Sequence, residues 1–139
     1  MKPDESLIAE LKKRAEKAAA HSYSPYSRFR VGAAVIANSG VIYSGCNVEN
    51  ASFGLTQCAE RSALTAAIAA GERPGSLECL VLYIPGNEAH PPCGACRQVM
   101  RELMSEGSRV YSFCDGDAVR SWSASDYLPD PFTPESLPR

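Results

Sequence analysis

Long apolar runs and an excess of positive charge are both missing from this chain of 139 residues. No segment approaches the roughly 20 consecutive apolar residues that a membrane-spanning helix requires. Lysine and arginine together number 14 against 16 aspartates and glutamates, which gives a formal net charge of −2. Proteins that bind duplex DNA or RNA are more often basic, with Lys and Arg gathered on one face. These absences argue against a membrane protein and against a nucleic-acid-binding module.

An export signal is missing as well. The chain starts with Met1-Lys2-Pro3-Asp4-Glu5, which is polar and acidic, whereas a secretory signal begins with basic residues and continues into an apolar stretch. Six cysteines in a chain without such a signal favour free thiols and metal binding over disulfides. A cytoplasmic enzyme is the simplest interpretation.

The length and composition fit one globular domain. An apolar content of 45% and a charged content of 22% are ordinary for a soluble protein, and a chain of this length can bury most of its apolar surface in a single core. No internal repeat is visible. We therefore expect residues 1–139 to form a single domain.

The apolar periodicity predicts a helix, a hairpin, a helix, a strand, a helix and a second hairpin. The link around Asp115-Gly116 is so short that the two strands it joins must be antiparallel. This order predicts an α/β fold, a three-layer α/β/α sandwich with a mixed five-stranded sheet. The expected helices cover 4–20, 58–70 and 93–104, with Asp4 capping the first and Gly107 stopping the third. The expected strands cover 29–37, 41–44, 79–84, 109–113 and 118–122.

The tail over 128–139 contains four prolines. Proline removes a backbone donor and breaks helices, so this tail should be extended or form at most one short turn of helix.

Three cysteines and one glutamate stand at the starts of two predicted helices, in Cys58-Ala59-Glu60 and Pro92-Cys93-Gly94-Ala95-Cys96. Structural zinc sites are closed by four protein ligands, whereas catalytic sites take three and leave the fourth position for water. Helix N-termini also lower thiol pKa values and so favour the thiolates that bind metal. The pattern predicts an open zinc site with an acid/base residue, Glu60, beside it.

The three remaining cysteines do not complete a closed four-ligand site. Cys79 and Cys114 fall in predicted strands, where a buried, inert thiol is the usual role. Cys46 stands near the start of the predicted loop over 45–57. His21 and His90 are not needed as ligands.

At these residues the chain resembles the small, homotetrameric, zinc-dependent cytidine deaminases, whose signature includes a glutamate that does not bind the metal. The resemblance covers most of residues 22–132. It is carried by residues 23–29, 31–34, 45–52, 58–61 and 92–98.

This resemblance implies hydrolytic deamination of cytidine and deoxycytidine to uridine and deoxyuridine plus ammonia, a step of pyrimidine salvage. It implies one Zn²⁺ per subunit, held by Cys58, Cys93 and Cys96. It also implies that Glu60 moves a proton from the attacking water to N3 of cytosine and then to the leaving amine.

The resemblance assigns the substrate contacts too. Asn47 and Glu49 are expected to hold the ribose hydroxyls, Phe29 to pack on the base, and the backbone N–H of Ala59 to bind an edge atom of the base. Phe132, in a tail at a subunit interface, is expected to reach the pocket of a neighbouring subunit in the homotetramer.

Two arginines are assigned to the ligand sulfurs. Three thiolates on Zn²⁺ leave a net negative charge, which a nearby cation should offset. The resemblance implies that Arg61 and Arg97 hydrogen-bond the sulfurs and supply that charge.

Two features depart from the family pattern. Pro91 stands where relatives usually have Ser or Thr, and residues 108–127 match family sequences poorly. The second departure leaves open a deaminase that acts on a modified cytosine nucleoside or a nucleoside antibiotic.

Two other functions are disfavoured by the sequence. Nucleic-acid editing enzymes of this superfamily join their fourth and fifth strands through a helix, an arrangement that the Asp115-Gly116 link excludes. A non-catalytic zinc-binding interaction module is disfavoured by the intact Glu60 and the open ligand position.

Overall fold

The computed structural model describes residues 3–138 and contains one five-stranded sheet with helices packed on it. Among these residues, no helix is both long and apolar enough to cross a bilayer. The helices are α1 (Glu5–Ala19), α2 (Ala59–Ala69), α3 (Gly94–Leu103) and the short α4 (Ala124–Tyr127), with 3-10 turns at Phe53–Leu55 and Pro134–Ser136. The strands are β1 (Gly32–Ala37), β2 (Ile42–Cys46), β3 (Leu77–Tyr83), β4 (Met104–Phe113) and β5 (Val119–Ser123).

The strands lie in the order β2-β1-β3-β4-β5. Only the β3–β4 pair is parallel, and the three other pairs are antiparallel. The mixed five-stranded sheet predicted from the sequence is therefore confirmed. The antiparallel β4–β5 hairpin is confirmed as well, as the tight Asp115-Gly116 link requires.

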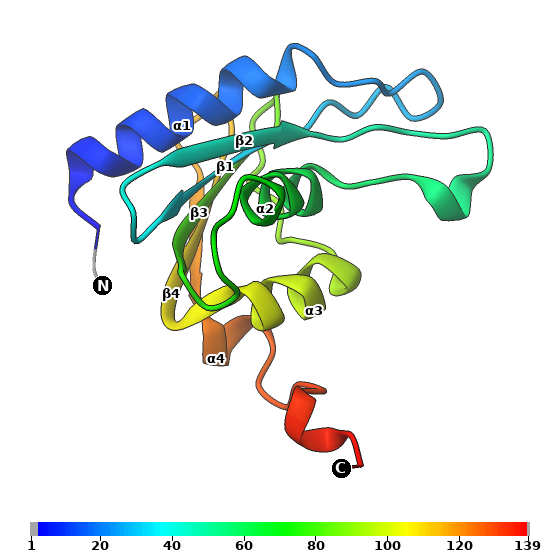
Figure 1. Cartoon of the computed structure of the whole chain (residues 1–139). Helices are drawn as coiled ribbons and strands as arrows, with labels where there is room; N and C mark the ends of the chain where they lie inside the picture. The colour runs from blue at the N-terminus through cyan, green and yellow to red at the C-terminus, as the bar shows by residue number, and fades with distance from the viewer. Residues whose placement is uncertain (1–2, 139) are drawn as a thin grey trace.

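Helices cover both faces of the sheet, so the predicted three layers are also confirmed (Figure 1). Side chains of the central strand β3 alternate between two cores. Leu80 and Leu82 belong to the core under α2 and α3, whereas Cys79 and Val81 belong to the core under α1. All four are buried, which places both faces of β3 inside the protein.

Two glycines let a helix backbone touch the first hairpin, one on each face. A Cβ added to Gly32 would lie 1.8 Å from the carbonyl oxygen of Ala15 in α1. A Cβ added to Gly45 would lie 2.6 Å from the backbone nitrogen of Ala63 in α2. Contacts this short cannot exist, so α1 and α2 sit at their observed depths only because these positions lack side chains.

The chain passes from α3 into β4 without a loop. Met104 has an extended backbone and pairs with Leu77 of β3, so the strand begins immediately after Leu103. Gly107 therefore lies inside β4, and the prediction that it stops the third helix was wrong. The capping of α1 by Asp4 is confirmed, since its carboxylate accepts the N–H of Leu7.

The C-terminal tail leaves the sheet after α4 and projects beyond the helical layer (Figure 1). Its regular structure is a single 3-10 turn, as the prolines predicted. The short helix α4 was not predicted. It forms a capping box in which Ser123 and Asp126 satisfy each other's backbone N–H groups.

Candidate active site

Three thiols meet where α2 and α3 begin, as the spacing predicted. Cys58 is the residue before α2, Cys93 is the residue before α3, and Cys96 lies in the first turn of α3. Their sulfur atoms all lie within 4.8 Å of one another. They come together because both helices pack on the same face of the sheet and both begin at the same edge of that layer.

The cluster fits a zinc ion. A Zn–S bond of about 2.3 Å in a tetrahedral arrangement places two ligand sulfurs about 3.8 Å apart. The Sγ atoms of Cys58 and Cys93 are 3.8 Å apart, and those of Cys93 and Cys96 are 3.2 Å apart. The first pair needs no adjustment and the second must open by about half an ångström. Three soft thiolate donors also match the metal in kind.

The protein favours a thiolate within this cluster. A hydrogen bond from the Cys96 thiol, together with Arg61, lowers the pKa of Cys58 to about 5. The pKa of Cys96 is raised, because its proton is the one shared with the Cys58 sulfur. Metal binding requires deprotonated sulfur. Because the pKa of Cys58 is low, less free energy is needed to remove its proton when zinc binds.

The side chain of Arg61 donates to a sulfur of the cluster, whereas the side chain of Arg97 donates to backbone carbonyls. The Nη2 atom of Arg61 donates to the Cys58 sulfur at 3.3 Å, and its buried Nε finds no partner within residues 3–138. Arg97 donates to the carbonyls of Pro92 and Tyr127, at 2.8 and 3.3 Å. These two carbonyls hold its guanidinium, so the contact with a ligand sulfur expected for Arg97 is absent from its described hydrogen bonds.

Glu60 lies in the first turn of α2 and is only 5% exposed. Burial raises the pKa of its carboxyl to about 7, and the nearby charge of Cys58 acts in the same direction. A carboxyl with such a pKa can both accept and release a proton near neutral pH.

A cavity of about 400 Å³ opens beside Glu60 and the thiols, within the size range of ligand pockets. Its walls are mostly apolar, with a few polar groups. It brings together all but one of the substrate contacts expected from the resemblance: Phe29, Asn47, Glu49 and Ala59.

Hydrogen bonds to other protein groups use most of the donors and acceptors of the Asn47 side chain. The residue is only 7% exposed. Its Oδ1 accepts from the hydroxyl of Ser22 and from the backbone N–H of Val31, while its Nδ2 donates to the carbonyl of Phe29 at 2.6 Å. An amide group has two acceptor positions and two donor hydrogens, so one N–H of Asn47 is left.

Glu49 is also held on one side. Its Oε1 accepts from the backbone N–H groups of Tyr26 and Ser27, at 2.9 and 3.1 Å. Its Oε2 accepts from the Ser27 hydroxyl, and these hydrogen bonds lower the pKa of the carboxyl. Each carboxylate oxygen has about two acceptor positions, so one position on Oε2 is left.

Sequence reasoning missed His90, which lines the same cavity. Its ring meets the edge of Phe29 with centroids 5.7 Å apart and planes at 78°. The two rings therefore form neighbouring parts of the cavity wall. The position of His90, three residues before Cys93, was the available signal.

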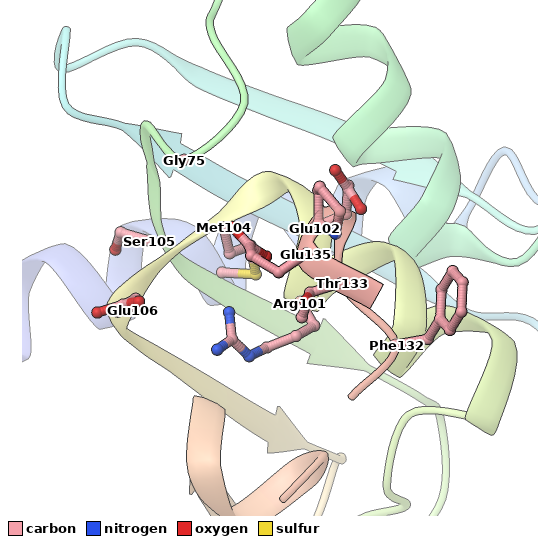
Figure 2. Close-up of a pocket in the computed structure, with 10 residues that line it drawn as sticks. Gly75, Arg101, Glu102, Met104, Ser105, Glu106, Phe132, Thr133 and Glu135 are labelled. Carbon is pink, nitrogen blue, oxygen red and sulfur yellow. The ribbon is translucent and has the colours of Figure 1, made fainter. Parts of the chain in front are cut away.

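Phe132 lies elsewhere in this chain. It is 59% exposed and borders a separate cavity of about 350 Å³ between the tail and the α3–β4 junction (Figure 2). Figure 2 shows its ring at one side of the group of lining residues, with Arg101 and Met104 nearer the middle. Its carbonyl accepts from the side chain of Gln98 at 2.8 Å. The expected approach to a neighbouring subunit stays a prediction.

Comparisons with known proteins agree with this geometry. The family model described as "Cytidine and deoxycytidylate deaminase zinc-binding region" matches residues 5–112. A cytidine deaminase of Halalkalibacterium halodurans is 43% identical over 126 residues, which are 90% of this chain and 93% of that protein. A cytidine deaminase of Sporosarcina psychrophila is 42% identical over 134 residues, or 96% of this chain and 93% of that protein.

Solved structures show the same fold. The crystal structure of cytidine deaminase from Burkholderia pseudomallei aligns with a TM-score of 0.85 at 47% identity, over 89% of this chain and 98% of that one. Cytidine deaminase from Mycobacterium tuberculosis aligns with a TM-score of 0.72 at 38% identity, over 89% of this chain and 95% of that one. With its thiol cluster, buried carboxyl and sheet order, the chain belongs to the zinc-dependent cytidine and deoxycytidylate deaminase family.

Proposed function

We propose that this protein catalyses the hydrolytic deamination of cytidine and deoxycytidine to uridine and deoxyuridine, with release of ammonia. The observation that carries the proposal is the buried Glu60 carboxyl, with a pKa of about 7, between a three-thiol cluster and a cavity of ligand size. The relatives named above support the same substrate class.

The residues divide the chemistry between them. Cys58, Cys93 and Cys96 would hold the zinc ion, which supplies a water activated as a nucleophile at neutral pH. Glu60 takes a proton from the attacking water and delivers it to N3 of cytosine. Glu60 then carries a second proton from the added hydroxyl to the amine at C4, which leaves as ammonia as the C4 carbonyl forms.

The base would be held by the first turn of α2 and by the cavity wall. Ala59 is the first residue of α2, where backbone N–H groups have no partner within the helix, so its N–H can bind an edge atom of the base. Phe29 offers an aromatic ring for packing on the base.

The sugar would be recognised by the hydrogen-bonding positions of Asn47 and Glu49 that no protein group among residues 3–138 uses. Asn47 retains one N–H donor and Glu49 retains one acceptor position on Oε2. A single hydroxyl can satisfy both by accepting from the amide and donating to the carboxylate. Ribose and deoxyribose share the 3′-hydroxyl, which supports activity on both nucleosides.

We assign the protein to pyrimidine salvage in the cytoplasm, which its six free cysteines support. We also propose that residues 1–139 form a single domain and that four copies of the chain assemble as a homotetramer. Phe53 and Leu55 lie 75% and 70% exposed on the loop before α2, and such apolar exposure is typical of surfaces that other chains cover. Sedimentation at monomer mass would contradict the tetramer.

The decisive experiment follows the change in ultraviolet absorbance as cytidine becomes uridine, with zinc content measured on the same samples. Wild type should convert both nucleosides. The Glu60→Gln variant should keep its zinc and lose turnover by several orders of magnitude, because the carboxyl is the proton carrier. Zinc-loaded wild type without activity on either nucleoside would refute the proposed function.

A further inference from the structure

The turn before β1 has an unusual backbone. Among residues 3–138, Arg28 is the one non-glycine residue with a positive φ, at 60°. An L-residue in this left-handed region costs free energy and persists only where the surrounding structure holds it. Here the N–H of Arg28 donates to the carbonyl of Ser24 at 2.9 Å, which closes the turn. Its neighbours Ser27 and Phe29 both line the cavity beside Glu60.

Ser27 connects two residues of the proposed substrate site. Its backbone N–H donates to Oε1 of Glu49 at 3.1 Å, and its hydroxyl donates to Oε2 of the same carboxylate. The same hydroxyl accepts the backbone N–H of Phe29 at 3.0 Å. One small side chain therefore touches both the carboxylate assigned to the sugar and the backbone of the residue assigned to the base.

The direction of these hydrogen bonds follows from the chemistry of a hydroxyl. It has one hydrogen and two acceptor positions. An ionised carboxylate can only accept, so the hydrogen goes to Glu49 and a lone pair receives the N–H of Phe29. Oε1 is fully used by the backbone donors of Tyr26 and Ser27, so the Ser27 hydroxyl is what fixes where Oε2 points.

We infer that Ser27 is a positioning residue for nucleoside binding, which aims the free acceptor position of Glu49 at the sugar and fixes the backbone at Phe29. The inference rests on the proposed function. Ser27 does not touch Glu60 or the thiols in any described hydrogen bond, so its effect falls on substrate binding and not on proton transfer.

Removing the hydroxyl leaves Oε1 anchored and Oε2 free to turn. Hydrogen bonds to charged groups are among the stronger ones, and losing this one should raise KM for cytidine about tenfold. The value of kcat should change less than twofold, because an interaction that is equal in the ground state and transition state affects KM alone. Ser27→Thr keeps the hydroxyl and should restore most of the binding.

The test compares Ser27→Ala with wild type on cytidine and on 2′,3′-dideoxycytidine. The second nucleoside lacks the 3′-hydroxyl that would donate to Glu49, so most of the penalty in KM should disappear with it. A matched control is Ser39→Ala, which removes a serine–glutamate hydrogen bond of 2.7 Å to Glu72 at the tip of the first hairpin. This control should leave KM for both nucleosides unchanged.

Equilibrium binding separates this inference from the proposed function. Cytidine binding is measured calorimetrically in a Glu60→Gln background, where turnover does not interfere, with and without Ser27→Ala. Weaker cytidine binding with unchanged zinc content supports the inference. Wild type that converts cytidine while Ser27→Ala leaves Kd and KM unchanged, or lowers only kcat, overturns the Ser27 inference alone. Wild type that neither binds nor converts cytidine overturns both.

Discussion

Gly45 is the position where a single methyl group should move the metal site. A Cβ at this residue would lie 2.6 Å from the backbone nitrogen of Ala63 and 2.7 Å from Cβ of Ser62. Ordinary contact begins at 3.4 Å, so α2 must retreat from β2 by about 0.8 Å or the strand must bend by as much. Because a backbone atom is the obstacle, no side-chain rotation can relieve the contact.

The size of the effect follows from two opposing terms. Replacing glycine by alanine in a strand gains about 0.5–1 kcal/mol through lower backbone entropy of the unfolded chain. Forcing extra volume into a packed interior costs about 1–3 kcal/mol. The clash is severe here, so we expect Gly45→Ala to destabilise the protein by about 2 kcal/mol net.

The functional consequence distinguishes Gly45 from Gly32. The helix displaced by Gly45→Ala carries Cys58 and Glu60, and a misplacement of about 1 Å can reduce a reaction rate about a hundredfold. The helix displaced by Gly32→Ala is α1, which supplies no residue to the cavity. Gly32→Ala should therefore lose at least as much stability but keep kcat and zinc in the molecules that remain folded.

Urea unfolding, zinc content after dialysis against a chelator and kcat for cytidine would be measured on both variants. Gly45→Ala should lose zinc faster than wild type and show a large fall in kcat below its unfolding transition. Wild-type stability in Gly45→Ala would refute the packing argument. An equal loss of kcat in both variants at matched folded fraction would refute the link between helix depth and the metal site.

Three further outcomes are expected. Arg61→Met removes the donor to the Cys58 sulfur and should weaken zinc retention by about 10–100-fold in a competition with a chelator, while unchanged retention would contradict a role for that contact. Asp115→Asn should reduce the fall in the free energy of unfolding that wild type shows as the pH is lowered. Hydrogen bonds from the Tyr83 hydroxyl and the Gly86 N–H lower the pKa of Asp115, so its contribution is complete above the ordinary value of 3.8 and is lost as pH falls through the lower folded pKa; parallel urea-unfolding curves for variant and wild type down to pH 3 would contradict this. Removing zinc should lower the midpoint of thermal unfolding, by an amount that corresponds to about 4 kcal/mol when zinc stands at a thousand times its Kd, and calorimetry that finds equal midpoints would contradict metal stabilisation of the fold.

Local sequence patterns predicted most of the fold, because neighbouring residues determine where most of its helices and strands form. The short Asp115-Gly116 link allows one strand arrangement, and the structure has it. The start of β4 could not be predicted in the same way. Met104 is a strand residue because it pairs with Leu77 of β3, and that partner is distant in sequence. Gly107 looked like a helix stop, although the helix had already ended.

The residues of the candidate site also divide into those that local sequence predicts and those that depend on distant partners. The thiols and Glu60 could be placed from spacing, since each stands at the start of a helix and both helices cover one face of the sheet. The substrate contacts came from family resemblance, not from physical reasoning. The hydrogen bond of Ser27 to Glu49 spans 22 residues and depends on the left-handed turn at Arg28, which no local propensity predicts.

The absence of a loop between α3 and β4 limits how the length of this chain can change. One residue inserted between Leu103 and Met104 would turn α3 by about 100° relative to the sheet, which would swing Cys96 away from the other two thiols. The alternative is a shift of β4 by one residue, which would bring its buried side chains to the opposite face. Insertions beside the exposed Glu88, in the loop between β3 and α3, meet neither constraint, because no helix or strand register crosses that loop. We therefore expect length variants to be tolerated beside Glu88 and to fail at the junction.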